Sequence, residues 1–174
     1  MSYFILEKHE AYIPPKIKNW HGKIETNPLK QKRGNMIPEY TTFPIMDHIQ
    51  TVFVDLIIHP CLMVSKKARE VIELYDSTLR FEQLLLYDQK NKKTQAYYLP
   101  KLPQLDVLTS NSQFNLDKSR IIHAEVDGKK TQQKVLFQLA NVNHVCILIH
   151  LDLIESLLRE GAICMGLKET TTIY

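Results

Sequence analysis

The chain has 174 residues, of which 44% are hydrophobic and 24% are charged, and its formal net charge at pH 7 is +3. This length and composition are typical of one globular domain, which excludes an intrinsically disordered chain and a miniprotein that depends on disulfides. The charge is too small to indicate nucleic-acid binding by the chain as a whole.

The cysteines and the N-terminus indicate where the protein is located. Cys61, Cys146 and Cys164 all have apolar neighbours, and no pair has CxxC spacing. Such thiols suit a reducing compartment better than a disulfide framework. The N-terminus has no basic leader, and no apolar run approaches the roughly 20 residues that span a bilayer. We therefore expect a cytoplasmic protein without membrane association.

An irregular segment follows a short first strand at residues 3–7. Residues 8–44 contain five prolines, and they carry seven Lys or Arg residues against three acidic ones. Proline fixes φ and removes a backbone donor, so regular elements in this segment must be short. We interpret residues 8–44 as an irregular basic arm that lies over an α+β core of residues 45–174, the two forming a single domain.

Two segments have the periodicity of amphipathic helices. After Ser65, apolar residues at positions 68, 71, 72 and 75 fall on one face, and the Ser65 hydroxyl is placed to cap the helix. The second helix spans residues 151–160, and Gly161 follows where a left-handed residue ends many helices.

The remaining ordered segments have the patterns of strands. Residues 80–87 and 94–99 flank a polar turn and predict a hairpin. Residues 120–126 alternate, which places Ile122, Ala124 and Val126 on one face, and Asp127-Gly128 predicts a two-residue turn into a strand at 135–139. Residues 145–149 are apolar on both faces and predict a central strand, and 162–167 predict the last one. The fold class is α+β, a mainly antiparallel sheet with a few packed helices; strand order and oligomeric state stay open.

Two sets of residues could carry chemistry. His144, Cys146 and His150 share one face of a regular strand and could bind zinc or form a Cys–His pair, as could His59 with Cys61. No other ligand pair completes a metal site, and catalytic thiols need electropositive surroundings that these apolar segments lack. We therefore expect buried structural thiols, without a metal or cofactor.

The second set is polar and follows a short apolar segment: Asp106, Thr109, Ser110, Asn111 and Ser112. Such a cluster can hold a hydroxyl nucleophile or a phosphate, but it is more typical of a turn. Phosphate loops, dinucleotide fingerprints, nucleophile elbows and HExxH motifs are missing. We predict no catalytic residues. An enzyme or small-molecule-binding domain that uses a pocket near Asp106–Ser112 or His144/Cys146/His150 is the alternative.

Basic residues gather at 30–33, 90–93 and 129–130. The last two groups fall in predicted turns, where lysines are commonly only solvated. The first lies in the arm with Trp20 and Tyr40, and Trp, Tyr and Arg are frequent in protein interfaces. A plain solvated arm is the main alternative, and nucleic-acid binding is a weaker one. We predict that Trp20, Arg33 and Tyr40 contribute to binding a protein partner.

The order and spacing of several segments resemble a bacterial immunity-protein family of polymorphic toxin systems, the one numbered eleven in that classification. The matching segments cover most of the chain outside the arm: Tyr3-Phe4-Ile5-Leu6, Asp55-Leu56-Ile57, residues 60–65 with the helix that follows, Tyr97-Tyr98-Leu99-Pro100, Leu105-Asp106-Val107-Leu108, and residues 151–159 before Gly161-Ala162-Ile163.

The resemblance implies a small cytoplasmic protein that binds and neutralises a cognate toxin made by the same cell, without catalysis. Inhibitors of basic nucleases usually present acidic surfaces, because complementary charge speeds association. The arm of this chain is basic instead, so we expect its toxin not to be a strongly basic nuclease.

Overall fold

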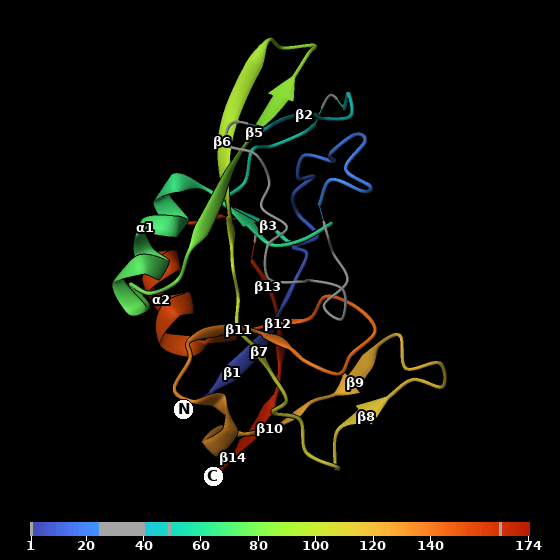
Figure 1. Cartoon of the computed structure of the whole chain (residues 1–174), viewed down its shortest axis with the longest axis vertical. Coiled ribbons are helices and arrows are strands. Elements are labelled where there is room, and N and C mark those ends of the chain that lie inside the picture. Colours follow the sequence, from blue (N-terminus) through green and yellow to red (C-terminus); the bar gives the residue numbers. More distant parts are fainter. Residues whose placement is uncertain (1, 25–40, 49, 164) are drawn as a thin grey trace.

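The computed structural model describes residues 2–24, 41–48, 50–163 and 165–174. In this part of the chain, two α-helices combine with several sheets of mostly short strands, a mixed α/β architecture compatible with the α+β class (Figure 1). Within the described ranges, every helix is too short or too polar to cross a membrane.

The first sheet contains the first strand of the chain beside a strand near its C-terminus and has the order β13-β1-β12-β11-β7. Its strands are β13 (Gly166–Glu169), β1 (Tyr3–Glu7), β12 (Ile147–His150), β11 (Leu136–Leu139) and β7 (Gln104–Leu105). The middle position of β12 confirms the predicted central strand. Its pairings with β1 and β11 are antiparallel, whereas β11 and β7 are parallel.

The second sheet has the order β2-β5-β6-β4-β3. Its strands are β2 (Thr41–Pro44), β5 (Phe81–Asp88), β6 (Lys93–Pro100), β4 (Met63–Val64) and β3 (Leu56–Ile57). The predicted hairpin is confirmed as β5 and β6, which project as a long ribbon (Figure 1). Residues 41–44, which we expected to be irregular, form β2 and pair in parallel with β5.

The two helices pack against each other on one side of the sheets (Figure 1). The helix predicted after Ser65 is confirmed as α1 (Lys66–Tyr75), and the Ser65 hydroxyl accepts a hydrogen bond from the backbone N–H of Ala68. The second is α2 (Leu151–Arg159), which Gly161 follows with a φ of 70°. Both helices therefore begin and end close to where the sequence indicates.

Three apolar clusters form the core. The first lies where both helices meet the sheets and includes Ile147 and Ile149, whereas the second includes Leu148. Successive side chains of β12 thus enter different clusters, which is why this strand is apolar on both faces. The third cluster belongs to the β2-β5-β6 end of the second sheet and includes Phe43 and Tyr97.

The prediction of one continuous strand at 120–126 is wrong, because the strand is broken at Ala124. It forms β9 (Ile121–His123), which pairs with β8 (Gln113–Phe114), and then β10 (Glu125–Asp127). Ala124 and Val126 are buried as predicted, but Ile121 is only 3% exposed while Ile122 is 56% exposed, so the buried face changes at the break. The break allows β10 to leave β8 and pair in parallel with β14 (Thr171–Ile173).

The prediction of a two-residue turn at Asp127-Gly128 is also wrong. The Asp127 carboxylate accepts a hydrogen bond from the Lys129 N–H and caps a short 3-10 helix, Gly128–Thr131, in place of a two-residue hairpin turn. The last strand predicted at 162–167 begins later, as β13. At Gly166 a Cβ atom would lie 2.7 Å from the backbone oxygens of residues 7 and 8, so the close approach of β1 requires glycine.

The described part of the arm, residues 8–24, is attached to the second sheet. Ile17 forms an antiparallel bridge with Ile45, and Ile13 forms a parallel bridge with Thr51. Ile17 and Ile24 are buried in the third cluster. This segment thus contributes to the core although it lacks regular elements.

Candidate functional site

Of the three residues predicted to contact a partner, the structure places Trp20. Its indole ring is half-buried against the third cluster, stacks on His21 at a centroid distance of 3.9 Å, and meets His59 edge-on at 6.1 Å. Its carbonyl oxygen accepts hydrogen bonds from the N–H groups of Lys23 and Ile24. Arg33 and Tyr40 lie outside the described residues.

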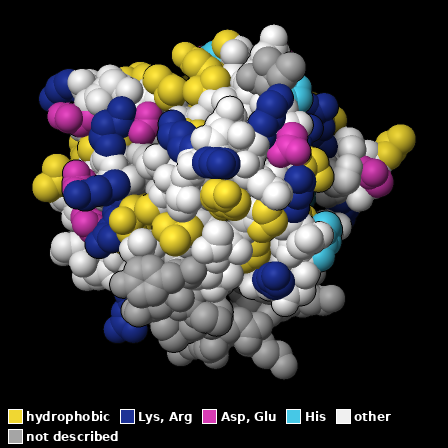
Figure 2. All heavy atoms as spheres, turned by 90° about the horizontal axis from the view of Figure 1, so that it is seen from above, with side chains coloured by type: hydrophobic (Ala, Val, Ile, Leu, Met, Phe, Trp, Pro, Cys, Tyr) yellow, Lys and Arg dark blue, Asp and Glu magenta, His cyan; other side chains and the backbone are white. Residues whose placement is uncertain are grey.

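A surface that includes Lys18, two residues before Trp20, combines charged side chains with exposed apolar ones. It lies where the turn between β5 and β6 approaches residues 46–48 and 50–53, and Figure 2 looks onto this end of the molecule. We call it the hairpin surface and define it as Lys18, Met46, Asp47, His48, Gln50, Val52, Lys90, Lys92 and Lys93. An open hollow of about 550 Å³ lies in it, lined by Asp47, His48, Gln50 and Lys90.

The turn of the hairpin surface is held by one carboxylate. Asp88 is buried and accepts hydrogen bonds from the N–H groups of Lys90 at 3.0 Å and Asn91 at 3.1 Å. The side-chain amide of Asn91 donates a further bond at 2.7 Å, which together with these N–H groups holds the pKa of the Asp88 carboxyl below its ordinary value. The lysines of the turn are therefore presented by a fixed backbone.

The charges of this surface are mainly positive. Lys90, Lys92 and Lys93 are exposed on the turn. Of the two neighbouring aspartates, Asp88 is engaged inside the turn, and Asp47 is 57% exposed with its carboxylate 4.0 Å from the Lys18 ammonium. An ion pair this long and exposed contributes little, so Asp47 keeps an exposed negative charge. The surface is nevertheless net positive, because it carries Lys18, Lys90, Lys92 and Lys93 against this one exposed carboxylate.

Apolar groups adjoin these lysines. Met46 is 49% exposed and Val52 is 38% exposed, and both belong to the segment that lines the hollow. The Phe53 ring lies beneath the Lys93 ammonium, 5.0 Å from the ring centroid. Apolar side chains next to a fixed polar turn are typical of surfaces that bind proteins.

The residues of the predicted His–Cys face have structural roles. Cys146 is buried in the second cluster, where burial raises the pKa of its thiol to about 12. The His150 Nδ1 atom accepts a hydrogen bond from the Asp152 N–H at 3.2 Å and caps α2, and its ring packs edge-on against Tyr3. His144 precedes β12 and lies outside the strand, so the three residues do not form one regular face.

The second predicted Cys–His pair, Cys61 with His59, also has a thiol with a raised pKa. Burial raises the pKa of the Cys61 thiol to about 12 as well, and His59 is in contact with Trp20. Cys164 lies outside the described residues. No group of three or more His, Cys, Asp or Glu side chains among the described residues is arranged to hold a metal ion.

The polar cluster at 106–112 closes a turn over β10. Glu125 accepts hydrogen bonds through its carboxylate from the Thr109 hydroxyl at 2.6 Å and the Asn111 amide at 2.9 Å. The Ser112 hydroxyl donates to the Glu125 carbonyl and accepts from its N–H, and Asp106 accepts from Asn141. The hydroxyls of Thr109 and Ser112 are thus engaged in holding the turn, through a glutamate that the sequence pattern did not single out.

The hairpin surface is only partly visible in the sequence. The lysines at 90–93 appear there as an ordinary solvated turn, and no local pattern connects them with residues 46–52, some forty positions away. Compared with family models and with curated proteins, the chain matches none.

Proposed function

We propose that this chain is a cytoplasmic, immunity-type protein that binds and neutralises a cognate bacterial protein toxin, without catalysis or a cofactor of its own. The observation that carries the proposal is the hairpin surface, a turn fixed by Asp88 that presents lysines beside exposed Met46 and Val52. The resemblance of the core segments to an immunity-protein family adds to it.

The rigidity of the turn supports a binding role. A surface that is already ordered before association loses less conformational entropy when the complex forms. Three hydrogen bonds to Asp88 fix this turn in the free chain. Trp20 follows Lys18 by two residues and is partly exposed, and we propose that it adds to the interface a residue type that often dominates interface energies.

The roles of the reactive side chains favour binding over catalysis. Cys146 is buried and Cys61 is partly buried, both with thiol pKa values raised by burial, and the hydroxyls of Thr109 and Ser112 are hydrogen-bonded to Glu125. The fold that we propose for this binding unit is α+β with a mainly antiparallel sheet. Among the described strands, parallel pairing occurs at the edge strands β7 and β2 and in the separate β10–β14 pair.

The test is capture of the partner. The tagged chain serves as bait in a lysate of its source cell, and mass spectrometry identifies what it retains. We expect one polypeptide in stoichiometric amount, which is toxic when expressed alone and harmless when this chain is co-expressed. Retention of no polypeptide while the toxin candidate is expressed, or unchanged toxicity on co-expression, would refute the proposed function.

A further inference from the structure

We infer that the partner presents an acidic, carboxylate-bearing protein surface to the hairpin surface. The inference rests on the proposed function and names the chemistry of the partner. It is carried by the charges, the hollow and the aromatic contacts of this end of the molecule.

Among the residues that the structure describes, no carboxylate forms an ion pair with Lys90 or Lys92. Lys90 and Lys92 are exposed, and Asp88 directs its carboxylate oxygens to the backbone and side chain of the turn. Desolvating ammonium groups is costly unless an opposite charge meets them. A partner that covers this turn is therefore favoured if it brings negatively charged groups, and on a protein surface these are carboxylates.

The hollow provides donors for such a group. His48 accepts a hydrogen bond at Nδ1 from the Gln50 N–H at 3.2 Å, so its neutral form carries the proton on Nε2. Lys90 and Asp47 also line the hollow, and the Asp47 carboxylate lies 4.0 Å from the Lys18 ammonium. A glutamate or aspartate side chain entering the hollow would meet the Lys90 ammonium and the His48 Nε2–H donor, against the repulsion of the Asp47 carboxylate, which the Lys18 ammonium partly offsets.

The aromatic residues favour a protein over a nucleic acid. Single strands bind by stacking bases on free aromatic faces. Here the ammonium of Lys93 covers the Phe53 ring, and Trp20 is stacked on His21. Met46 and Val52 add exposed aliphatic surface, which suits the apolar side chains of a protein.

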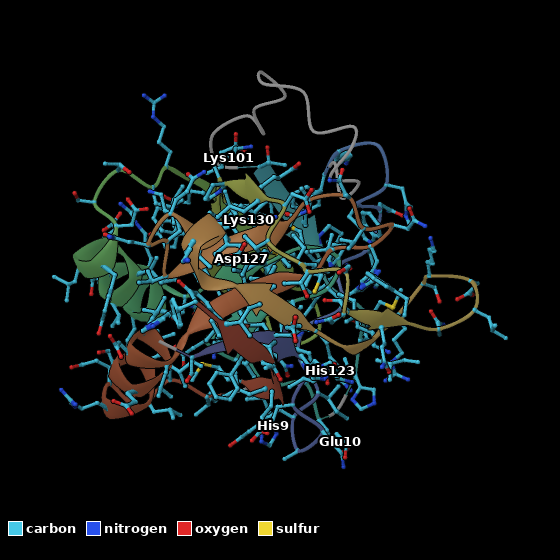
Figure 3. All side chains as sticks on the ribbon, turned by 90° about the horizontal axis from the view of Figure 1, so that it is seen from below. His9, Glu10, Lys101, His123, Asp127 and Lys130 are labelled. Atoms are coloured by element: carbon cyan, nitrogen blue, oxygen red, sulfur yellow. The ribbon has the colours of Figure 1, made fainter. Side chains whose placement is uncertain are left out.

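The experiment compares two charge reversals of equal size. Lys90→Glu/Lys92→Glu changes the hairpin surface, and Lys129→Glu/Lys130→Glu changes another turn that is also capped by an aspartate, at the end of the molecule shown in Figure 3. Both pairs of lysines are exposed. Circular dichroism and thermal melting serve as the check that each variant is folded. The ligands are the captured toxin, a fluorescent peptide of glutamate and leucine, and a single-stranded oligonucleotide.

We expect the Lys90/Lys92 variant to lose about tenfold in the rate constant of toxin association at low ionic strength, because complementary charge acts mainly on this rate. The control variant should stay within about twofold of wild type. The acidic peptide should bind the wild-type chain and the control but not the Lys90/Lys92 variant.

Equal association rates for both variants, or tighter binding of the oligonucleotide than of the acidic peptide to the hairpin surface, would overturn the inference while leaving the immunity function standing. Conversely, if the peptide discriminates between the variants but no toxin is captured, the immunity function fails and the acidic ligand class is retained.

Discussion

Asp55 connects three segments that are far apart in the sequence. Its carboxylate is 13% exposed and accepts hydrogen bonds from the Ser65 hydroxyl at 2.6 Å and from the Ile163 N–H at 2.9 Å, and the Lys67 ammonium lies 3.2 Å away. Its own backbone pairs with the same two residues, Ser65 and Ile163. One side chain thus joins the start of β3, the N-terminus of α1 and the strand-entry segment after α2.

The cost of removing this carboxylate follows from its partners. A hydrogen bond to a charged group contributes about 1.5–3 kcal/mol, and a donor left without a partner loses the compensation for its desolvation. The pair with Lys67 adds little because that ammonium is 43% exposed. We therefore expect Asp55→Ala to lower the free energy of unfolding by about 3–4 kcal/mol, which for a domain of this size lowers Tm by roughly 10 °C.

Urea unfolding followed by far-UV circular dichroism measures this change. Asp47→Ala is the matched control, because it removes an exposed carboxylate with only a 4.0 Å ion pair, and it should change the free energy by less than about 0.5 kcal/mol. A loss below about 1 kcal/mol for Asp55→Ala would refute the reasoning, since it would mean that the three segments hold together without the carboxylate.

Three further predictions concern other parts of the structure. Gly166→Ala should lower the free energy of unfolding by more than about 2 kcal/mol, because its methyl group would collide with backbone oxygens of β1, whereas Gly161→Ala, which has open space and a φ of 70°, should cost about 1 kcal/mol; equal thermal shifts would contradict this. Cys61 and Cys146 should resist iodoacetamide in the folded protein at mildly alkaline pH, because pKa values near 12 leave almost no thiolate; peptide mapping that finds either one labelled as fast as in urea would show the thiol to be accessible. Trp20→Ala should weaken toxin binding by more than about 1 kcal/mol and also cost about 1–2 kcal/mol of stability, since the ring is half-buried against the third cluster; titration calorimetry and thermal melting separate the two effects, and unchanged binding would remove Trp20 from the interface.

The elements that the sequence determined by itself are those whose signals are local. The Ser65 cap and the apolar spacing after it fixed α1, because a helix depends on neighbours three and four residues away. Two apolar runs around a polar turn fixed the β5–β6 hairpin, and the continuous apolar run of β12 marked the centre of a sheet.

Tertiary structure decided the features that depend on distant partners. The break at Ala124 exists because β10 turns to pair with β14, and β2 is a strand because β5 is available beside it. A strand's own pattern does not say which distant segment it pairs with, because both partners are needed to define the pairing. For the same reason, the hairpin surface cannot be recognised from the sequence alone. Lysines in a polar turn look merely solvated until the folded chain places Asp47, His48 and two apolar residues next to them, because surface chemistry is the sum of segments that only the fold brings together.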